Sequence, residues 1–226
     1  DERLGRGASG KTFQKTVRQD SSRPRRGQDG RRGSRDHTTL KYVGRGGLKL
    51  EAALGHFQID PQDTICLDVG ASTGGFTDCL LKAGAKKVYA VDVGYGQFDW
   101  TLRNDPRVVL IERQNIRHLR QEKITEPVNL VVIDVSFVSL KLVFPVVKKF
   151  LASQSQILAL IKPNFEVEPK HVGKKGVVKD PALHEKVVEE IKAAGIVLGW
   201  RCQGTCPSPL LGAQGNREFF VYFKMA

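Results

Sequence analysis

The chain has 226 residues, of which 40% are hydrophobic, enough for one domain with a sizeable core plus an appendage. No apolar run approaches the roughly 20 residues of a membrane span, and the polar, basic N-terminus does not resemble a signal peptide, so we expect a cytoplasmic protein. The formal net charge of +12 favours a polyanionic partner, and nucleic acid before a membrane surface.

Half of this net charge is concentrated in residues 1–40, which hold 11 Lys/Arg against 5 Asp/Glu. The run at residues 23–33 has almost nothing to bury and is predicted to be flexible when free. An RNA-binding arm has this composition, and so does a linker or a remnant of another segment. We therefore divide the chain into a basic N-terminal arm or remnant, residues 1–40, and one folded domain, residues 41–226.

Strand-like and helical patterns alternate along the rest of the chain. Helical spacing of apolar residues predicts helices at residues 48–57, 76–84, 140–151 and 181–194. Apolar runs predict strands at residues 64–69, 87–92, 108–111, 129–134, 157–162, 195–202 and 218–224. This order predicts an α/β fold with a mostly parallel, seven-stranded, Rossmann-like sheet and helices on both faces. The last two strands lack an intervening helix, so one of them is expected to run antiparallel.

The turn after the first strand is rich in glycine, as in the opening unit of a nucleotide-binding α/β sheet. Ser72 stands where the G-x-G-x-x-G motif has the second glycine, which lets a pyrophosphate approach the backbone. This argues against NAD or FAD and for a nucleoside ligand without phosphates, with S-adenosylmethionine as the first candidate; a turn that binds nothing is the alternative. Asp92 lies 22 positions after Gly70, where such folds place a carboxylate that grips a ribose.

Four polar residues lie at predicted carboxyl ends of strands, namely Asp68, Asp92, Asp134 and Lys162. Ligands of open α/β sheets bind at this edge, so we expect these residues to converge on one cleft. Burying an unpaired ammonium is costly, and Asp134 is the natural partner for Lys162. Alternatively, Lys162 extends to solvent and Asp134 caps the next helix. Their joint position beside the glycine turn favours a functional site.

Six short motifs follow in order from about Tyr42 to the C-terminus, at residues 42–50, 68–77, 91–97, 134–137, 162–166 and 215–219. Together they resemble the TlyA (hemolysin A-like) branch of the FtsJ-like ribosomal RNA methyltransferases. The resemblance implies a class I methyltransferase fold that uses S-adenosyl-L-methionine to methylate a ribose 2′-hydroxyl of ribosomal RNA. That family normally has an S4 RNA-binding domain before the catalytic one, which residues 1–40 do not resemble. Gly44 and Asn164 also stand where the family usually has serine and glutamine.

The resemblance also implies the site residues. The family's Lys-Asp-Lys-Glu catalytic tetrad falls on Lys49, Asp134, Lys162 and Glu218. A 2′-hydroxyl is a poor nucleophile, and we expect Lys162 to act as its base, with Lys49 and Asp134 orienting it and Glu218 in a peripheral role. The residues expected to contact the cofactor are Asp68, Gly70, Ser72, Gly74, Gly75, Asp92, Asn115 and Asp134.

No metal is expected in this site, because the sulfonium methyl donor needs no metal to activate it. Cys202 and Cys206 lack a second Cys/His pair, so we also expect no zinc site and reduced thiols.

Several alternatives remain open at this level. A non-catalytic RNA-binding or ribosome-associated protein could keep this fold, although an intact tetrad argues against it. A small-molecule methyltransferase fits the basic charge poorly, and the hemolysin name would imply membrane lysis, for which no lytic helix is evident. The basic loop at residues 170–176 is expected to contact RNA phosphates; a solvated lid is the alternative. The sequence leaves the oligomeric state and the target nucleotide open.

Overall fold

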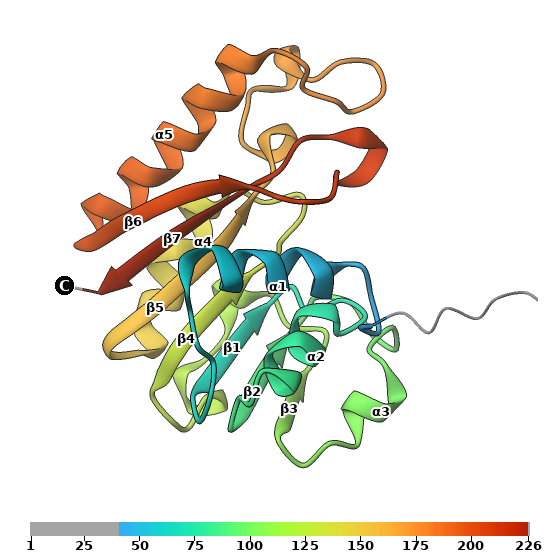
Figure 1. Cartoon of the computed structure of the whole chain (residues 1–226), viewed down its shortest axis with the longest axis vertical. Helices are drawn as coiled ribbons and strands as arrows, with labels where there is room; N and C mark the ends of the chain where they lie inside the picture. Colours follow the sequence, from blue (N-terminus) through green and yellow to red (C-terminus); the bar gives the residue numbers. More distant parts are fainter. Residues whose placement is uncertain (1–40, 226) are drawn as a thin grey trace, which may run out of the picture. The chain divides into compact units, whose positions relative to one another are not determined.

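A computed structural model describes residues 41–225; the predicted basic arm, residues 1–40, lies outside the described residues. Seven strands form one sheet in the order β3-β2-β1-β4-β5-β7-β6 (Figure 1). The strands are β1 Ile65–Val69, β2 Lys87–Val91, β3 Val108–Ile111, β4 Val128–Ile133, β5 Leu151–Ile161, β6 Trp200–Pro207 and β7 Phe219–Met225. The pairs among β1–β5 are parallel, and β7 runs antiparallel to both β5 and β6. The predicted seven-stranded sheet with one reversed strand is therefore confirmed.

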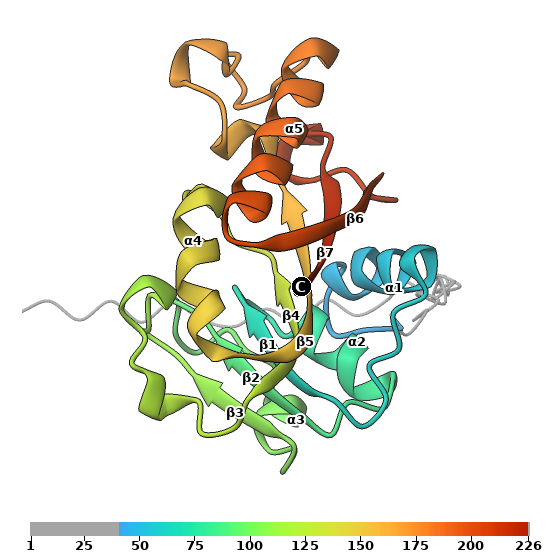
Figure 2. The ribbon, with the colours of Figure 1, turned by 90° about the vertical axis from the view of Figure 1, so that its left-hand side faces the viewer.

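Helices cover both faces of this sheet. They are α1 Gly46–Phe57, α2 Gly75–Lys82, α3 Trp100–Arg103, α4 Leu140–Val147 and α5 Pro181–Val197. In Figure 2, α1 and α2 lie on one side of the strands, and α4 and α5 lie on the other. Side chains alternate along a strand, so in β4 Leu130 packs on the α1 and α2 side, and Val131 packs on the α4 and α5 side. Burial on both faces explains the continuous apolar run of this strand.

The predicted boundaries on both sides of the α4–β5 connection are wrong. The helix predicted at residues 140–151 ends at Val147, and β5 begins at Leu151 rather than at residue 157. The first half of β5 is polar and contains Gln154 at φ +66°, so no apolar run marks it as a strand. Ser155 holds this irregular part to β4, because its hydroxyl donates to the carbonyl of Val128 at 2.7 Å.

The helix α5 continues past its predicted end at residue 194 to Val197, and β6 therefore begins at Trp200 rather than at residue 195. Gly195 does not break this helix; it lets the helix approach the sheet, because a Cβ there would lie 2.5 Å from the ring of Phe223. The turn that ends the helix comes at Gly199, where φ is +87°.

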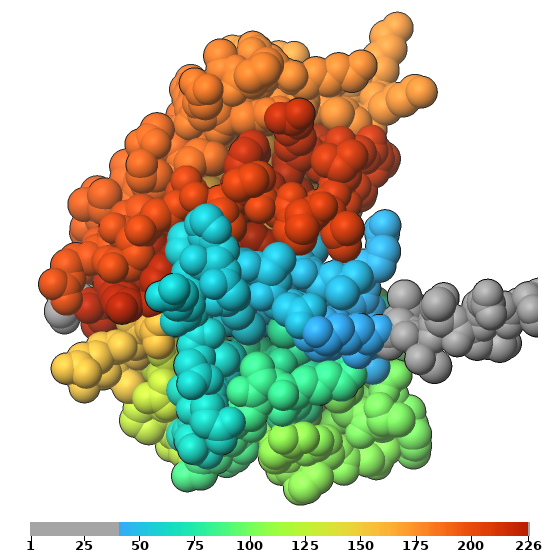
Figure 3. Space-filling view, viewed as in Figure 1, coloured from blue at the N-terminus to red at the C-terminus, as the bar shows by residue number. Residues whose placement is uncertain are grey.

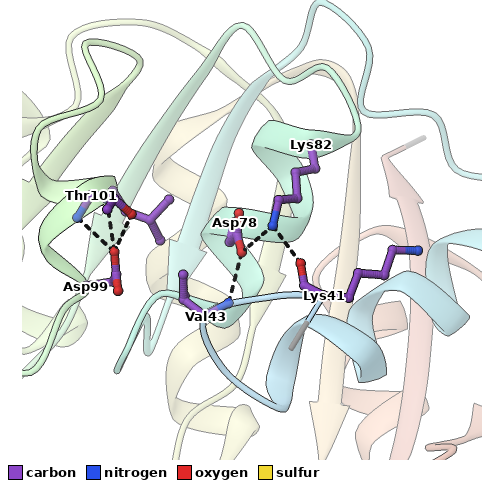
Figure 4. A network of polar contacts seen from close by, with 7 residues as sticks. Lys41, Val43, Asp78, Lys82, Asp99 and Thr101 are labelled. Atoms are coloured by element: carbon purple, nitrogen blue, oxygen red, sulfur yellow. Dashed lines mark hydrogen bonds and ion pairs between the residues drawn. The ribbon is translucent and has the colours of Figure 1, made fainter. Parts of the chain in front are cut away.

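The segment before α1 is fixed to α2 by a small polar network (Figure 4). The backbone amide of Val43 donates to Asp78 Oδ2 at 2.9 Å. Lys82 Nζ donates to the same carboxylate oxygen at 3.0 Å and to the carbonyl of Lys41 at 2.6 Å. The start of α1 is thereby held beside the helix that follows the glycine turn.

Among residues 41–225, no helix combines the length and the apolar character needed to cross a membrane.

Candidate active site

A cleft of about 560 Å³ opens at the carboxyl ends of the parallel strands. Its lining includes five of the predicted cofactor contacts, namely Gly70, Ser72, Asp92, Asn115 and Asp134. The volume lies in the range of pockets that hold small ligands. Of the four strand-end residues expected to converge on one cleft, Asp92 and Asp134 line it. Asp68 is buried outside the lining, and Lys162 is not part of the lining either but contacts Asp134.

The turn between β1 and α2 is shaped by close backbone contacts. Gly70 has φ +89°, and a Cβ there would lie 2.2 Å from the carbonyl oxygen of Asp134. Ser72 also adopts a left-handed φ of +51°, and its backbone amide donates to Asp92 Oδ2 at 2.7 Å. A carboxylate thus already accepts from the turn amide, so this amide is not free to bind a pyrophosphate oxygen.

Three predicted cofactor contacts lie outside the lining of this cleft. Asp68 is fully buried in β1, where its Oδ2 accepts from Thr77 Oγ1 at 2.7 Å and its Oδ1 has no partner among the described residues. Burial raises the pKa of this carboxyl to about 7, and the nearby charge of Asp134 adds to the effect. Its hydrogen bond with Thr77 joins β1 to α2, so Asp68 stabilises the turn that connects them.

The other two are glycines that allow close packing around the turn. A Cβ on Gly74 would lie 2.6 Å from Leu102, and one on Gly75 would lie 3.0 Å from the backbone nitrogen of Gly47. Gly75 also lines a smaller cavity of about 100 Å³ that borders Asp134. These glycines let α1 and the α3 region press against the turn.

The four residues of the predicted tetrad form two ion pairs. Lys162 Nζ lies 2.6 Å from Asp134 Oδ1, and Lys49 Nζ lies 2.6 Å from Glu218 Oε2. Lys49 donates a hydrogen bond to its partner. Lys162 instead donates to Ser136 Oγ at 3.0 Å, and its contact with Asp134 is close but lacks hydrogen-bond alignment, since Asp134 Oδ1 accepts none.

Both ion pairs lie at the same end of two neighbouring strands. β5 ends at Ile161, which pairs with Phe219, the first residue of the antiparallel strand β7. Lys162 directly follows the end of β5, and Glu218 directly precedes the start of β7. Lys49 reaches this end from α1, and Asp134 follows β4 directly. The sheet order, with β7 inserted beside β5, therefore brings the two pairs to one edge, and all four side chains are largely shielded from solvent.

One residue at the mouth of the cleft was missed from the sequence. Phe137 lines the cleft with its side chain 90% exposed, and its φ of +62° is unusual for an aromatic residue. Its ring centroid lies 4.8 Å from that of Phe165. The motif at residues 134–137 contained Phe137, but neither its left-handed backbone nor its exposure can be read from the sequence.

Glu166, at the end of another motif, has a structural role. Its carboxylate accepts from Ser139 Oγ at 2.5 Å and from the backbone amide of Leu140 at 2.8 Å, so it caps the start of α4. Burial raises the pKa of Glu166. This cap fixes the loop that connects Asp134 to α4.

A mostly parallel sheet of this order, with a nucleoside-sized cleft and paired lysines at its carboxyl edge, is the arrangement of a methyltransferase. The chain belongs to the FtsJ-like methyltransferase family, whose model matches residues 42–225. The resemblance drawn from the six motifs is therefore confirmed.

Its relatives place it near one branch of that family. It is 48% identical over 183 residues to the 16S/23S rRNA (cytidine-2'-O)-methyltransferase TlyA of Mycobacterium tuberculosis, covering 81% of this chain and 68% of that protein. It is 47% identical over 184 residues to YqxC of Bacillus subtilis, which is named as an rRNA methyltransferase, covering 81% of this chain and 66% of that protein. The chain thus spans about two thirds of the length of these curated relatives.

A solved structure from Lactococcus lactis, of a protein named as a hemolysin, is similar with a TM-score of 0.80 at 42% identity. The match covers 83% of this chain and 90% of that one. More distant methyltransferases share the fold alone, such as NodS of Bradyrhizobium japonicum with a TM-score of 0.55 at 11% identity.

Proposed function

We propose that this chain transfers a methyl group from S-adenosyl-L-methionine to a ribose 2′-hydroxyl of ribosomal RNA, in the cytoplasm. The observation that carries the proposal is the Lys162–Asp134 ion pair at the border of a nucleoside-sized cleft. A phosphate-free cofactor fits the turn between β1 and α2, where Asp92 already accepts from the Ser72 amide.

The cleft residues suggest how the cofactor is held. The Asp92 carboxylate is the acceptor for the ribose hydroxyls, and the Cβ-free Gly70 lets the ligand approach the backbone. Asn115 Oδ1 accepts from the backbone amide of Arg117 at 3.0 Å, which leaves its amide nitrogen to donate to the adenine. When bound, S-adenosyl-L-methionine supplies an electrophilic methyl group on a sulfonium cation.

The methyl acceptor needs a group that takes its proton. In its neutral form, Lys162 accepts the proton of the 2′-hydroxyl as the oxygen–methyl bond forms and the sulfur–methyl bond breaks, so the sulfur leaves as a neutral thioether. Asp134 and Ser136 hold the Lys162 amine in place. The Lys49–Glu218 pair is itself formally neutral and supports the same edge of the sheet.

Two features of the chain favour RNA over a small acceptor. The net charge of +12 suits a polyanion, and the exposed ring of Phe137 offers a stacking surface for an unpaired base. The names of the curated relatives point to ribosomal RNA. A non-catalytic RNA-binding protein would have no need for a lysine pair beside a cofactor cleft.

The test has a binding arm and an activity arm. Calorimetry should detect S-adenosylhomocysteine binding and no NAD binding, because the Ser72 turn excludes a pyrophosphate. Incubation with labelled S-adenosylmethionine and separately purified 16S and 23S ribosomal RNA should label at least one of them. Two results would overturn the proposal. One is tight NAD binding without S-adenosylhomocysteine binding; the other is that neither ribosomal RNA becomes labelled.

A further inference from the structure

A second cleft, of about 870 Å³, lies between two loops near the carboxyl end of the sheet. One loop, residues 171–180, leads into α5, and the other, residues 214–217, leads into β7. Figure 1 draws the first loop in orange and the second in red, and Figure 3 shows both at the surface of the same face of the domain. We call this hollow the basic cleft.

The basic cleft is held open by hydrogen bonds that join its two loops. The buried side chain of Asn216 accepts from the backbone amide of Val178 at 3.1 Å and donates to the carbonyl of Gly176 at 2.8 Å. Its amide also donates to the carbonyl of Ala213 at 3.0 Å. His184, buried in α5, bonds to the carbonyl of Val178 at 2.8 Å. A buried amide with three partners makes this a specified structure rather than a chance gap between surface loops.

The lining of the basic cleft is strongly cationic. Its charged residues are Lys174, Lys175, Lys179 and Arg217 against the single acid Asp180. Within residues 41–225 none of the four cations forms a salt bridge. By contrast Lys170, at the start of the same loop, is already paired with Glu168 at 2.7 Å. Clustered cations that outnumber the nearby acids repel one another, and an anion bound among them relieves that repulsion.

The basic cleft adjoins the proposed catalytic edge. Arg217 directly precedes Glu218, whose carboxylate accepts a hydrogen bond from Lys49 Nζ. A Cβ on Gly176 would lie 2.6 Å from the side chain of Gln214, so the two rims are in close contact near this point. Ammonium and guanidinium groups are the usual ligands of phosphate oxygens. If the ribose of one RNA nucleotide lies at Lys162, the phosphates of the neighbouring nucleotides would therefore lie near this cleft.

We propose that the basic cleft binds the backbone phosphates of the RNA that flank the methylated nucleotide. The inference rests on the proposed function, since it assumes that the acceptor is RNA. The site reads no sequence; it fixes the position of the strand so that one ribose faces Lys162.

The test compares two double variants that remove the same charge. Lys174→Gln/Lys175→Gln removes two cations of the basic cleft. Lys86→Gln/Lys123→Gln removes two exposed lysines that precede β2 and β4, at the opposite edge of the sheet. RNA affinity is measured with purified ribosomal RNA over a range of salt concentrations, and S-adenosylhomocysteine affinity is measured as a check on folding.

The cleft variant should bind RNA about tenfold more weakly at 0.1 M salt, and the slope of log affinity against log salt should fall by about 1.4, or roughly 0.7 for each single-strand phosphate that is no longer neutralised. The control variant should show neither change, and both should bind S-adenosylhomocysteine like the wild type. Equal RNA affinity and slope in the two variants would overturn the inference. Poly-glutamate serves as a second probe, an anionic polymer without phosphate groups. If the cleft variant binds poly-glutamate more weakly but binds RNA like the wild type, the inference is also overturned. Wild-type protein that binds RNA through this cleft but labels no RNA would count against the proposed function instead.

Discussion

At the scale of single residues, the two ion pairs of the proposed tetrad differ in their surroundings. The Lys49–Glu218 pair is the more enclosed, because Glu218 is buried and a Cβ on Gly212 would lie 1.9 Å from its carboxylate. Asp134, in contrast, lines the cofactor cleft. We therefore assign the chemistry to the pair that contains Lys162 and a supporting role to the other pair.

Replacing Lys162 tests this assignment. Lys162→Ala should lower the single-turnover rate of methyl transfer by about 10²- to 10⁴-fold, the usual contribution of a general base, while S-adenosylhomocysteine binding persists. Lys162→Arg should fail as well, because a guanidinium does not lose its proton in proteins. Saturating RNA separates the chemical step from binding. A near wild-type rate for Lys162→Arg would show that only positive charge is required there, and Lys49 would be the next candidate base.

Asp68 should make stability depend on pH. Burial raises the pKa of its carboxyl to about 7, whereas in the unfolded chain it titrates near the usual value of about 3.9. The folded state therefore holds a proton that the unfolded state has released, so the free energy of unfolding should fall as the pH rises from about 4 to 7. Above pH 7 this group should add no further dependence.

The isosteric variant Asp68→Asn, which mimics the neutral acid, isolates this contribution. Denaturant unfolding at pH 5 and pH 8, without cofactor, should show a smaller loss of stability for the variant than for the wild type. Parallel pH dependence in the two proteins would mean that Asp68 titrates normally.

At the scale of elements, the sequence predicted those parts whose pattern is local. The strands β1–β4 lie within one or two residues of their predicted ranges because apolar runs end at polar residues such as Asp92 and Asp134. The first half of β5 was missed because it is polar and joined to β4 by Ser155, a contact far apart in sequence. Likewise Lys49 and Glu218 form an ion pair although they lie 169 positions apart in the sequence. Only the motif resemblance assigned both residues to the same site.

Two helix glycines should respond to alanine with opposite signs. Gly195 in α5 has no room for a Cβ, which would lie 2.5 Å from Phe223, whereas Gly55 in α1 has no atom within 4 Å of the added Cβ. Gly195→Ala should lower the free energy of unfolding by about 1–3 kcal/mol through overpacking. Gly55→Ala should raise it by about 0.5–1 kcal/mol, because alanine favours a helix. Denaturant unfolding measures both; a stabilised Gly195→Ala would show that α5 does not press on β7.

At the scale of the whole molecule, the fold provides the proposed active site, and the net charge favours a polyanionic partner. The folded domain, residues 41–226 as the sequence predicts it, supplies the proposed cofactor cleft and the paired lysines. The chain carries a net charge of +12, half of it in residues 1–40, and this charge concerns partners rather than the fold. The family relation extends over residues 42–225, so the basic arm is outside the part that the family shares.

Removing residues 1–40 tests whether the arm contacts RNA. Without the arm, RNA binding should be weaker and its salt dependence flatter, by about 0.7 in slope for each phosphate that the arm neutralises. Affinity for S-adenosylhomocysteine should stay the same, because the proposed cofactor contacts all lie within residues 68–134. An unchanged salt slope would mean that the arm does not take part in RNA binding.

The central claim concerns the atom that receives the methyl group. Ribosomal RNA labelled by the protein and digested to nucleosides should release the label as a 2′-O-methylated nucleoside, and the bond next to it should resist alkali, since the free 2′-hydroxyl is needed for cleavage. An RNA fragment with a 2′-deoxy nucleotide at the labelled position should accept no methyl group. Label on a base, or undiminished transfer to the 2′-deoxy fragment, would contradict the account.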